Sequence, residues 1–252
     1  MPDEPGDELA LPDLPDLLKK VRARTPARLL TGRAGAAYRT ETQIDLRDAH
    51  AAARDAVRIE FEIEAAFGAA FVQQWGLFEV CTQASSKEAF LLRPDLGRHF
   101  SEEARQQVKE RCAVNADLQV VIGDGLSVPA VSTQVPALLP LLEEGTKALG
   151  WTFGQPFAIR HCRVAILNEI GVLLAPRVAV LLIGERPGLA TAESLSAYMA
   201  YRPRTNDSDA NRNLISNIHP RGITPRDAAN RILKLATQMV NVGSSGYAVR
   251  EE

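Results

Sequence analysis

Short apolar runs that end in glycine-rich turns constrain the fold of this chain more than any other feature. Leu118–Ile122 leads directly into the turn Gly123–Ser127, and Arg177–Ile183 leads into Gly184–Leu189. Apolar runs of this length, rich in β-branched residues, are typical of strands that are buried on both faces, as in parallel sheets. Phe157–Ile166 is a third strand candidate. Three such strands, at least two of them ending in glycine turns, predict an open, mostly parallel α/β sheet.

Segments with helical spacing of apolar residues follow these strands. Val131–Leu149 comes after the first glycine turn, and its Pro136 and Pro140 predict irregular first turns. Pro225–Val240 carries an apolar stripe that would cover one sheet face, and Thr224 stands where a helix N-cap is expected. The predicted fold class is therefore α/β: an open, mostly parallel sheet flanked by helices, with an N-terminal helical segment.

Composition along the chain predicts three parts. Residues 1–16 are acidic and rich in proline, so we expect a flexible tail. Residues 17–80 form a basic and helical segment, and residues 81–252 form the α/β domain. Between Leu17 and Thr40 the chain carries many lysines and arginines and no acid. Two interpretations of this basic stretch stay open: a solvated face, or an arm that docks on an acidic partner.

A helical run fills the rest of the N-terminal segment. From Thr42 to the residue before Gly76, an alanine-rich pattern predicts a long helix or a helix pair. Arg47, His50 and Arg54 recur at spacings of three and four residues, which places them on one helix face. We expect this stripe to face solvent or a partner.

Charge and cysteine content exclude several classes of protein. The net charge of −2 provides no overall attraction to nucleic acid or to an anionic membrane surface. The most apolar stretch, Val178–Ile183, is far shorter than the ~20 residues that a membrane span requires. Cys81, Cys112 and Cys162 are odd in number and far apart, which favours a reducing compartment. We therefore expect a cytoplasmic protein with no nucleic-acid or membrane partner.

The two glycine turns are the best candidates for a ligand site. In open sheets, ligands bind where the strands end, because the loops diverge there and leave a crevice. Asp124–Ser127 and Gly184–Gly188 occupy such positions and are rich in glycine and polar groups. The alternative is that both turns merely reverse the chain. A further glycine turn, Thr31–Gly35, lacks the spacing of a phosphate-binding motif.

A self-contained active site is not visible in the sequence. The four histidines lie far apart, and no motif supplies a nucleophilic serine. His161 and Cys162 are neighbours inside the third predicted strand, so their side chains would point to opposite faces. Asp48–His50 begins like the D-x-H-x-x-G signature of many cobalamin proteins, but Ala53 stands where glycine is required. We therefore expect no catalytic residue and no metal ligand in this chain.

Several sequence blocks, spread over most of the chain, form a specific pattern when taken together. They are Thr31–Gly35 with Tyr38–Glu41, Asp48–Val57, Leu92–Arg98, Gly123–Ser127, Leu182–Leu189 and Ile215–Pro220. This pattern resembles the light chain of ethanolamine ammonia-lyase. Each block alone is weak evidence, whereas their number and order make the resemblance specific.

The resemblance implies a subunit of a two-subunit lyase that converts ethanolamine to acetaldehyde and ammonia by a radical route. Adenosylcobalamin supplies the radical in that family. A larger catalytic subunit holds ethanolamine and the catalytic residues, whereas the light chain contacts cobalamin at the subunit interface. A rival interpretation is a non-catalytic Rossmann-like domain that binds a nucleotide or metabolite at Gly123–Ser127. A third is a purely structural assembly protein.

The resemblance also implies three cofactor-contacting positions. They fall on Val164 in the third predicted strand, on Glu185 in the second glycine turn, and on Leu214, where the family often has cysteine. The Glu185 carboxylate can accept hydrogen bonds from corrin amides, with pairing to Arg186 or another neighbour as the alternative. Val164 would make contact through strand backbone. Leu214 retains the capacity for apolar packing but cannot take a thiol role.

Some relatives are directed into a protein-shelled microcompartment by an N-terminal amphipathic peptide. Leu14, Leu17, Leu18 and Val21 would form a short helix of that kind, although two prolines prevent a longer one. Encapsulation is therefore an open hypothesis, alongside free location in the cytoplasm.

Overall fold

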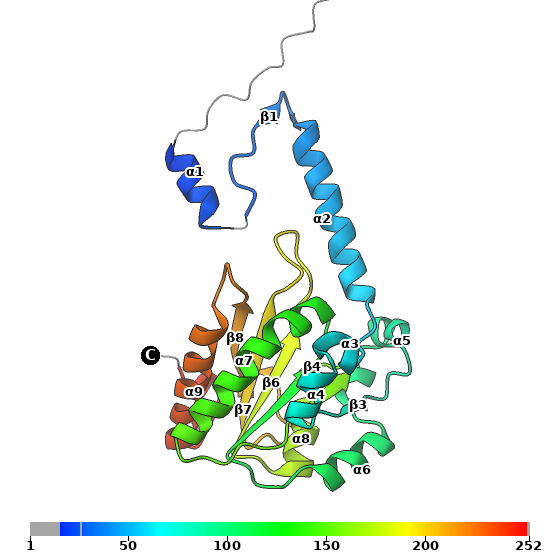
Figure 1. The fold of residues 1–252 in the computed structure, drawn as a ribbon, viewed down its shortest axis with the longest axis vertical. Helices are drawn as coiled ribbons and strands as arrows, with labels where there is room; N and C mark the ends of the chain where they lie inside the picture. The colour runs from blue at the N-terminus through cyan, green and yellow to red at the C-terminus, as the bar shows by residue number, and fades with distance from the viewer. Residues whose placement is uncertain (1–15, 26, 251–252) are drawn as a thin grey trace, which may run out of the picture.

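The computed structural model describes residues 16–25 and 27–250, which are built around one six-stranded sheet (Figure 1). The helices are α1 (Asp16–Ala23), α2 (Thr40–Arg58), α3 (Ile63–Phe67), α4 (Ala69–Trp75), α5 (Lys87–Leu92), α6 (Glu102–Arg111), α7 (Val128–Ala148), α8 (Ile166–Leu174) and α9 (Pro225–Val242). The strands are β1 (Arg33–Ala34), β2 (Ala37–Tyr38), β3 (Glu79–Cys81), β4 (Leu118–Gly123), β5 (Phe157–Arg160), β6 (Val178–Gly184), β7 (Leu195–Tyr201) and β8 (Asn213–Ile218). No helix in this described part of the chain is long and apolar enough to cross a bilayer.

The sheet has a parallel half and an antiparallel edge. Its strand order is β3-β5-β4-β6-β7-β8. The pairs β3–β5, β5–β4 and β4–β6 are parallel, whereas β6–β7 and β7–β8 are antiparallel. Parallel neighbours cannot be joined by a hairpin, so helices α5 to α8 form the crossovers between β3 and β6. The predicted α/β class is confirmed, as a mixed sheet flanked by helices.

Helices cover the two faces of the sheet unequally. On one face α7 and α9 lie over the strands (Figure 1). Together with side chains of α3 and α4 they form a large apolar core. On the other face α6 and α8 pack against side chains such as Val121 and Leu181. The outer strands β7 and β8 carry exposed side chains on this second face, including Leu214 and Ser216. One corner of the sheet is therefore left open.

The two strands that precede glycine turns lie where the sequence predicts them. All residues of β4 and β6 are buried, which explains why their sequences are almost uninterrupted apolar runs. The helices after them also begin with the expected chemistry. Ser127 caps α7 and Thr224 caps α9, each by accepting a hydrogen bond from a backbone N–H of the first turn. Pro136 and Pro140 lie inside a continuous α7, so the prediction of irregular first turns is wrong.

The third predicted strand, Phe157–Ile166, is shorter than expected. β5 ends at Arg160, because His161 adopts a left-handed backbone conformation with φ of 56°. The His161 ring is held by two contacts from distant segments. Its Nδ1 lies 2.9 Å from the carbonyl oxygen of Ala84, and its Nε2 lies 3.0 Å from the carboxylate of Glu60. These long-range contacts offset the backbone strain and end the strand early.

The N-terminal helical run forms three helices, whereas the sequence predicts one or two. The extended backbone of residues 59–62 separates α2 from α3, and Gly68 with φ of 77° separates α3 from α4. The run ends before Gly76, as predicted. α2 extends away from the sheet (Figure 1), and its stripe of Arg47, His50 and Arg54 is exposed. A domain boundary at residue 80 stays a prediction, and the predicted tail lies outside the described residues except for Asp16.

Candidate functional site

A small cavity of about 190 Å³ opens where the parallel strands β4, β5 and β6 end. The loop after β4, the turn after β5 and the loop after β6 line it, together with Ser196 and Tyr198 of β7. Leu126, Arg163 and Glu185 come from these three segments in that order. This is the edge at which open sheets bind ligands, because the connecting loops diverge there. Two of the predicted cofactor positions, Val164 and Glu185, lie on the cavity.

The Glu185 carboxylate is fixed in place by three hydrogen-bond donors. Its Oε1 accepts from the hydroxyl of Ser196 at 2.6 Å and from the backbone N–H of Asn217 at 2.9 Å. Its Oε2 accepts from the hydroxyl of Ser194 at 2.8 Å. These neighbours, and not Arg186, orient the group. An ionised carboxylate can accept about four hydrogen bonds, so acceptor capacity remains for a ligand in the cavity.

Val164 lies in the turn between β5 and α8, so the prediction that it belongs to a strand is wrong, whereas its contact with a cofactor stays a prediction. Its carbonyl oxygen accepts a hydrogen bond from the backbone N–H of Leu167, 3.2 Å away, at the start of α8. The residue is half-buried and lines both the small cavity and a larger one beside it. Its side chain packs against the apolar core on the α6 and α8 face of the sheet.

Leu214 lies next to the same cavity on the open corner of the sheet. It is the cross-strand partner of Tyr198, which lines the cavity. Directly opposed residues of antiparallel strands share a face, so the two side chains lie side by side. Leu214 is 47% exposed, which is unusual for a leucine in the middle of a strand. The structure thus brings together Val164, Glu185 and Leu214 at one corner of the sheet.

The loop after β4 differs from the predicted open crevice because much of it is packed into the protein. Asp124 and Ser127 are fully buried. The ammonium group of Lys87, on α5, lies 3.0 Å from the Asp124 carboxylate and also donates to the carbonyl oxygen of Gly125. The sequence analysis did not single out Lys87, because its partner is far away along the chain. Of this loop, only Gly125 and Leu126 reach the small cavity.

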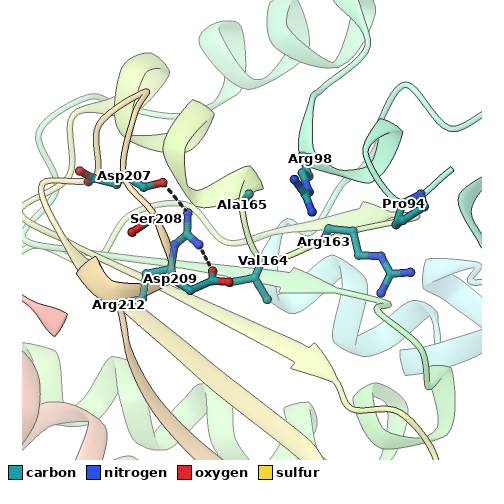
Figure 2. A pocket seen from close by; sticks show the side chains of 9 residues that line it. All are labelled: Pro94, Arg98, Arg163, Val164, Ala165, Asp207, Ser208, Asp209 and Arg212. Atoms are coloured by element: carbon teal, nitrogen blue, oxygen red, sulfur yellow. Dashed lines mark hydrogen bonds and ion pairs between the residues drawn. The ribbon is translucent and has the colours of Figure 1, made fainter. Parts of the chain in front are cut away.

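A larger cavity of about 500 Å³ adjoins the small one through Arg163 and Val164. Figure 2 shows Asp207, Asp209 and Arg212 on one side of it, linked by a hydrogen bond and an ion pair. Arg98 and Arg163 lie on the other side. The sequence analysis missed these arginines as site residues. Two features of the sequence could have indicated them as site residues. Arg163 directly precedes Val164, and Arg98 ends the family-like block Leu92–Arg98.

Cys162 is among the residues around the small cavity, but it is fully buried and its thiol is not a nucleophile. Burial, followed by the nearby charge of Asp124, raises the pKa of Cys162 well above its ordinary value. The thiolate is therefore not populated at neutral pH. In the part of the chain that the structure describes, no group of three or more histidine, cysteine or acidic side chains is placed to hold a metal ion.

These features define an α/β protein with two adjoining open cavities at the carboxyl edge of its parallel strands. The family model described as ethanolamine ammonia-lyase light chain matches residues 15–250. The ethanolamine ammonia-lyase small subunit of Clostridium perfringens is 40% identical over 231 residues, which cover 92% of this chain and 76% of that protein. The chain belongs to the ethanolamine ammonia-lyase light-chain family, and the resemblance seen in the sequence blocks is thereby confirmed.

Proposed function

We propose that this chain is the small subunit of an adenosylcobalamin-dependent ethanolamine ammonia-lyase and forms one wall of the cobalamin site against a large catalytic subunit. When bound, adenosylcobalamin supplies the radical chemistry that converts ethanolamine to acetaldehyde and ammonia. The large subunit binds ethanolamine and carries the catalytic residues. The small subunit binds and orients the cofactor.

The observation that carries this proposal is the convergence of the three family-implied positions on one open corner of the sheet. Val164 and Glu185 share a cavity, and Leu214 lies beside the cavity residue Tyr198. Their chemistry fits a corrin ring. Glu185 is a pre-oriented acceptor for the amide N–H groups at the ring edge. Val164 and the exposed Leu214 offer apolar contact to its methyl-bearing edge.

The open geometry of this surface supports a partner. The small cavity holds about 190 Å³, whereas pockets that enclose drug-sized ligands measure roughly 300–1,000 Å³ and bury most of the ligand. A corrin lying across it would keep one face exposed, and a second polypeptide is needed to cover that face. The isolated chain is therefore expected to bind cobalamin weakly.

The rival interpretation, nucleotide binding at Gly123–Ser127, has less support. A Cβ atom built on Gly125 would lie 2.4 Å from the carbonyl oxygen of Gly184, so the loop backbone is already in close contact with protein. The Asp124 carboxylate, which would repel phosphate, is buried behind it. A phosphate-binding loop needs backbone N–H groups that are free to meet the anion.

Reconstitution tests the proposed function. Purified chain is mixed with the large subunit from the same organism, and ethanolamine deamination is measured with and without adenosylcobalamin. We expect activity only when both chains and the cofactor are present. In parallel, the isolated chain is titrated with cobalamin and with ATP and NAD. Micromolar or tighter binding of either nucleotide, without cobalamin-dependent activity in the mixture, would replace the proposal with the rival interpretation.

The same proposal includes a location in the cytoplasm, with encapsulation in a microcompartment as an open hypothesis. Leu17, Leu18 and Val21 lie on α1, and Leu17 is 70% exposed. The fourth residue of the predicted peptide, Leu14, lies outside the described residues. Removing residues 1–23 and measuring copurification with shell proteins tests encapsulation separately from catalysis.

A further inference from the structure

Three arginines without an acidic partner surround the two adjoining cavities. Arg163 lines both, Arg98 lines the larger cavity and Arg186 lines the smaller one. Within residues 16–25 and 27–250, none of these three side chains forms a hydrogen bond or an ion pair. Figure 2 shows Arg98 and Arg163 apart from the linked group around Arg212.

The acidic residues across the larger cavity are occupied by other groups. Arg212 pairs with the Asp209 carboxylate. The Asp207 carboxylate accepts a hydrogen bond from the backbone N–H of Arg204 at 2.8 Å. Among the described residues, no ion pair joins either acid to Arg98 or Arg163.

Arg163 differs in this respect from four other arginines of the sheet domain that are partly or fully buried. Those arginines have a carboxylate within ion-pair distance: Arg105 with Glu169, Arg160 with Glu79, Arg177 with Asp117 and Arg212 with Asp209. The Nε of Arg163 is buried without a hydrogen-bond partner, as are those of Arg160 and Arg212, so this nitrogen does not set Arg163 apart. The difference is that Arg160 and Arg212 have a carboxylate partner and Arg163 has none.

The protein holds the Arg163 side chain in place without satisfying its charge. Its guanidinium carbon lies 4.4 Å from the centroid of the Phe90 ring, a cation–π distance. Its backbone N–H donates to the carbonyl oxygen of Gly97 at 2.8 Å. Gly97 also leaves space for the aliphatic part of the Arg163 side chain, because a Cβ atom at position 97 would lie 2.9 Å from Cγ of Arg163. The guanidinium is therefore a pre-oriented set of donors.

The positive charges of the three arginines also repel one another. Burial is the main cause that lowers the pKa of Arg163, and the charges of Arg186 and Arg98 lower it further, against an opposing effect of Asp124. Guanidinium groups nevertheless stay protonated. An anion bound between them would relieve both the desolvation and the repulsion.

We propose that Arg163, flanked by Arg98 and Arg186, binds the phosphodiester of the cobalamin nucleotide loop. This inference rests on the proposed function, since the phosphodiester is the anionic group of that cofactor. Planar guanidinium donors match phosphate oxygens in geometry and charge. Arg163 directly precedes Val164, and Arg186 directly follows Glu185. The phosphate site therefore adjoins the surface on which the corrin lies.

Comparison of two corrinoids tests the assignment by binding. Adenosylcobinamide keeps the corrin and the adenosyl group but lacks the nucleotide loop and its phosphodiester. Dissociation constants of adenosylcobalamin and adenosylcobinamide are measured by equilibrium dialysis on the complex with the large subunit, for wild type, Arg163→Gln and Arg186→Gln. The matched control is Arg202→Gln, which alters an arginine in a cavity lined by Asn115, Ala175 and Arg177.

Arg163→Gln is expected to weaken adenosylcobalamin binding by about 10- to 100-fold, because it removes a charge-assisted hydrogen bond. Binding of adenosylcobinamide is expected to stay within about twofold of wild type. Arg186→Gln, at an exposed position, is expected to show the same selectivity with a smaller loss, which covers the case that Arg163→Gln does not fold. Arg202→Gln is expected to leave both constants unchanged.

Two results would overturn the assignment while leaving the proposed function intact. One is an equal effect of Arg163→Gln and Arg186→Gln on both corrinoids, including no effect at all. The other is weaker subunit association without any corrinoid, which would assign Arg163 to a carboxylate of the large subunit. If the wild-type complex binds neither corrinoid, the proposed function itself fails.

Discussion

The loops after β4 and after β6 leave neighbouring parallel strands at the same edge of the sheet, yet their environments are opposite. In the first loop Asp124 is fully buried and forms an ion pair of 3.0 Å with Lys87. In the second loop Arg186 and Gly188 are exposed, and Glu185 faces a cavity. One loop is part of the protein interior, and the other borders an open cavity.

This difference shows that a glycine turn after a buried strand does not by itself indicate a ligand site. Glycine permits close approach of backbone in both loops. In the first, the approaching group is protein: the long side chain of Lys87 and the backbone of Gly184 occupy the space. In the second, no described segment fills the equivalent position beside Glu185, and a cavity remains. The predictions below test this contrast, from the largest expected effect to the smallest.

Lys87→Met is expected to destabilise the protein by about 3–5 kcal/mol, because it leaves the buried charge of Asp124 without a partner. The free energy of unfolding is measured in urea. Arg186→Met, in the open loop, serves as the control and is expected to change it by less than about 0.5 kcal/mol. The double variant Lys87→Met/Asp124→Asn is expected to recover part of the loss. Equal stability of Lys87→Met and wild type would contradict the packed description of the first loop.

Gly125→Ala is expected to cost about 2–4 kcal/mol of unfolding free energy. The position has φ of +54°, and a Cβ atom would lie 2.4 Å from the carbonyl oxygen of Gly184, so strain and overpacking add. Gly188→Ala in the open loop is the matched control, because its nearest atom would be 4.0 Å away. Thermal or urea unfolding compares the pair. Similar losses in both variants would show that the two loops do not differ in packing.

Glu185→Gln is expected to weaken cofactor retention by about 1–3 kcal/mol while changing stability less than Gly125→Ala does. The carboxylate is oriented by Ser194 and Ser196, and its loss removes the charged acceptor from the cavity. Retention is measured by gel filtration of the two-subunit complex loaded with adenosylcobalamin. Glu193→Gln, at an exposed position nearby, provides the control. Unchanged retention in Glu185→Gln would remove this residue from the site.

Glu60→Gln is expected to change how the free energy of unfolding depends on pH. Burial raises the pKa of Glu60, but hydrogen bonds from His161 and from the backbone N–H of Lys87 outweigh it, so that the pKa lies below 4.5. A carboxylate with a lowered pKa in the folded state stabilises it above the unfolded pKa, and this contribution is lost as pH falls through the folded pKa. The stability difference between wild type and variant is therefore expected to be largest near pH ~5.5 and to shrink toward pH ~3.

The exposed Glu62→Gln, two residues away, is the control for this last prediction and is expected to leave the unfolding free energy unchanged at both pH values. Urea unfolding at the two pH values measures the difference. A stability difference for Glu60→Gln that grows as pH falls would contradict the assigned hydrogen bonds.

The parts of the fold that could be predicted from the sequence are those whose pattern is local. β4 and β6 are continuous apolar runs because both of their faces are buried. The antiparallel strands β7 and β8 were not predicted. In β8, exposed residues such as Ser216 and Asn217 break the apolar pattern, whereas β7 is almost wholly buried. The predicted end of β5 was wrong for another reason. His161 takes its conformation from contacts with Ala84 and Glu60, which lie far away in the sequence.

The residues of the candidate site likewise fall into those that the sequence indicates and those that only the structure reveals. The glycine turn that holds Glu185 was identified from its position after a strand, and Val164 and Leu214 came from the family resemblance. Arg163 could not be recognised from sequence as an unpaired arginine, since pairing depends on which carboxylates fold next to it.

The sequence alone therefore determined the α/β class and the family, and it predicted the strand ends at which the structure has a cavity. Apolar periodicity, capping residues and glycine turns act over a few residues, so they can be recognised along the chain. Only the tertiary structure decided which strand-end loop is filled and which is open. Lys87 reaches Asp124 across 37 residues of chain, and a contact over that separation is set by how the layers pack.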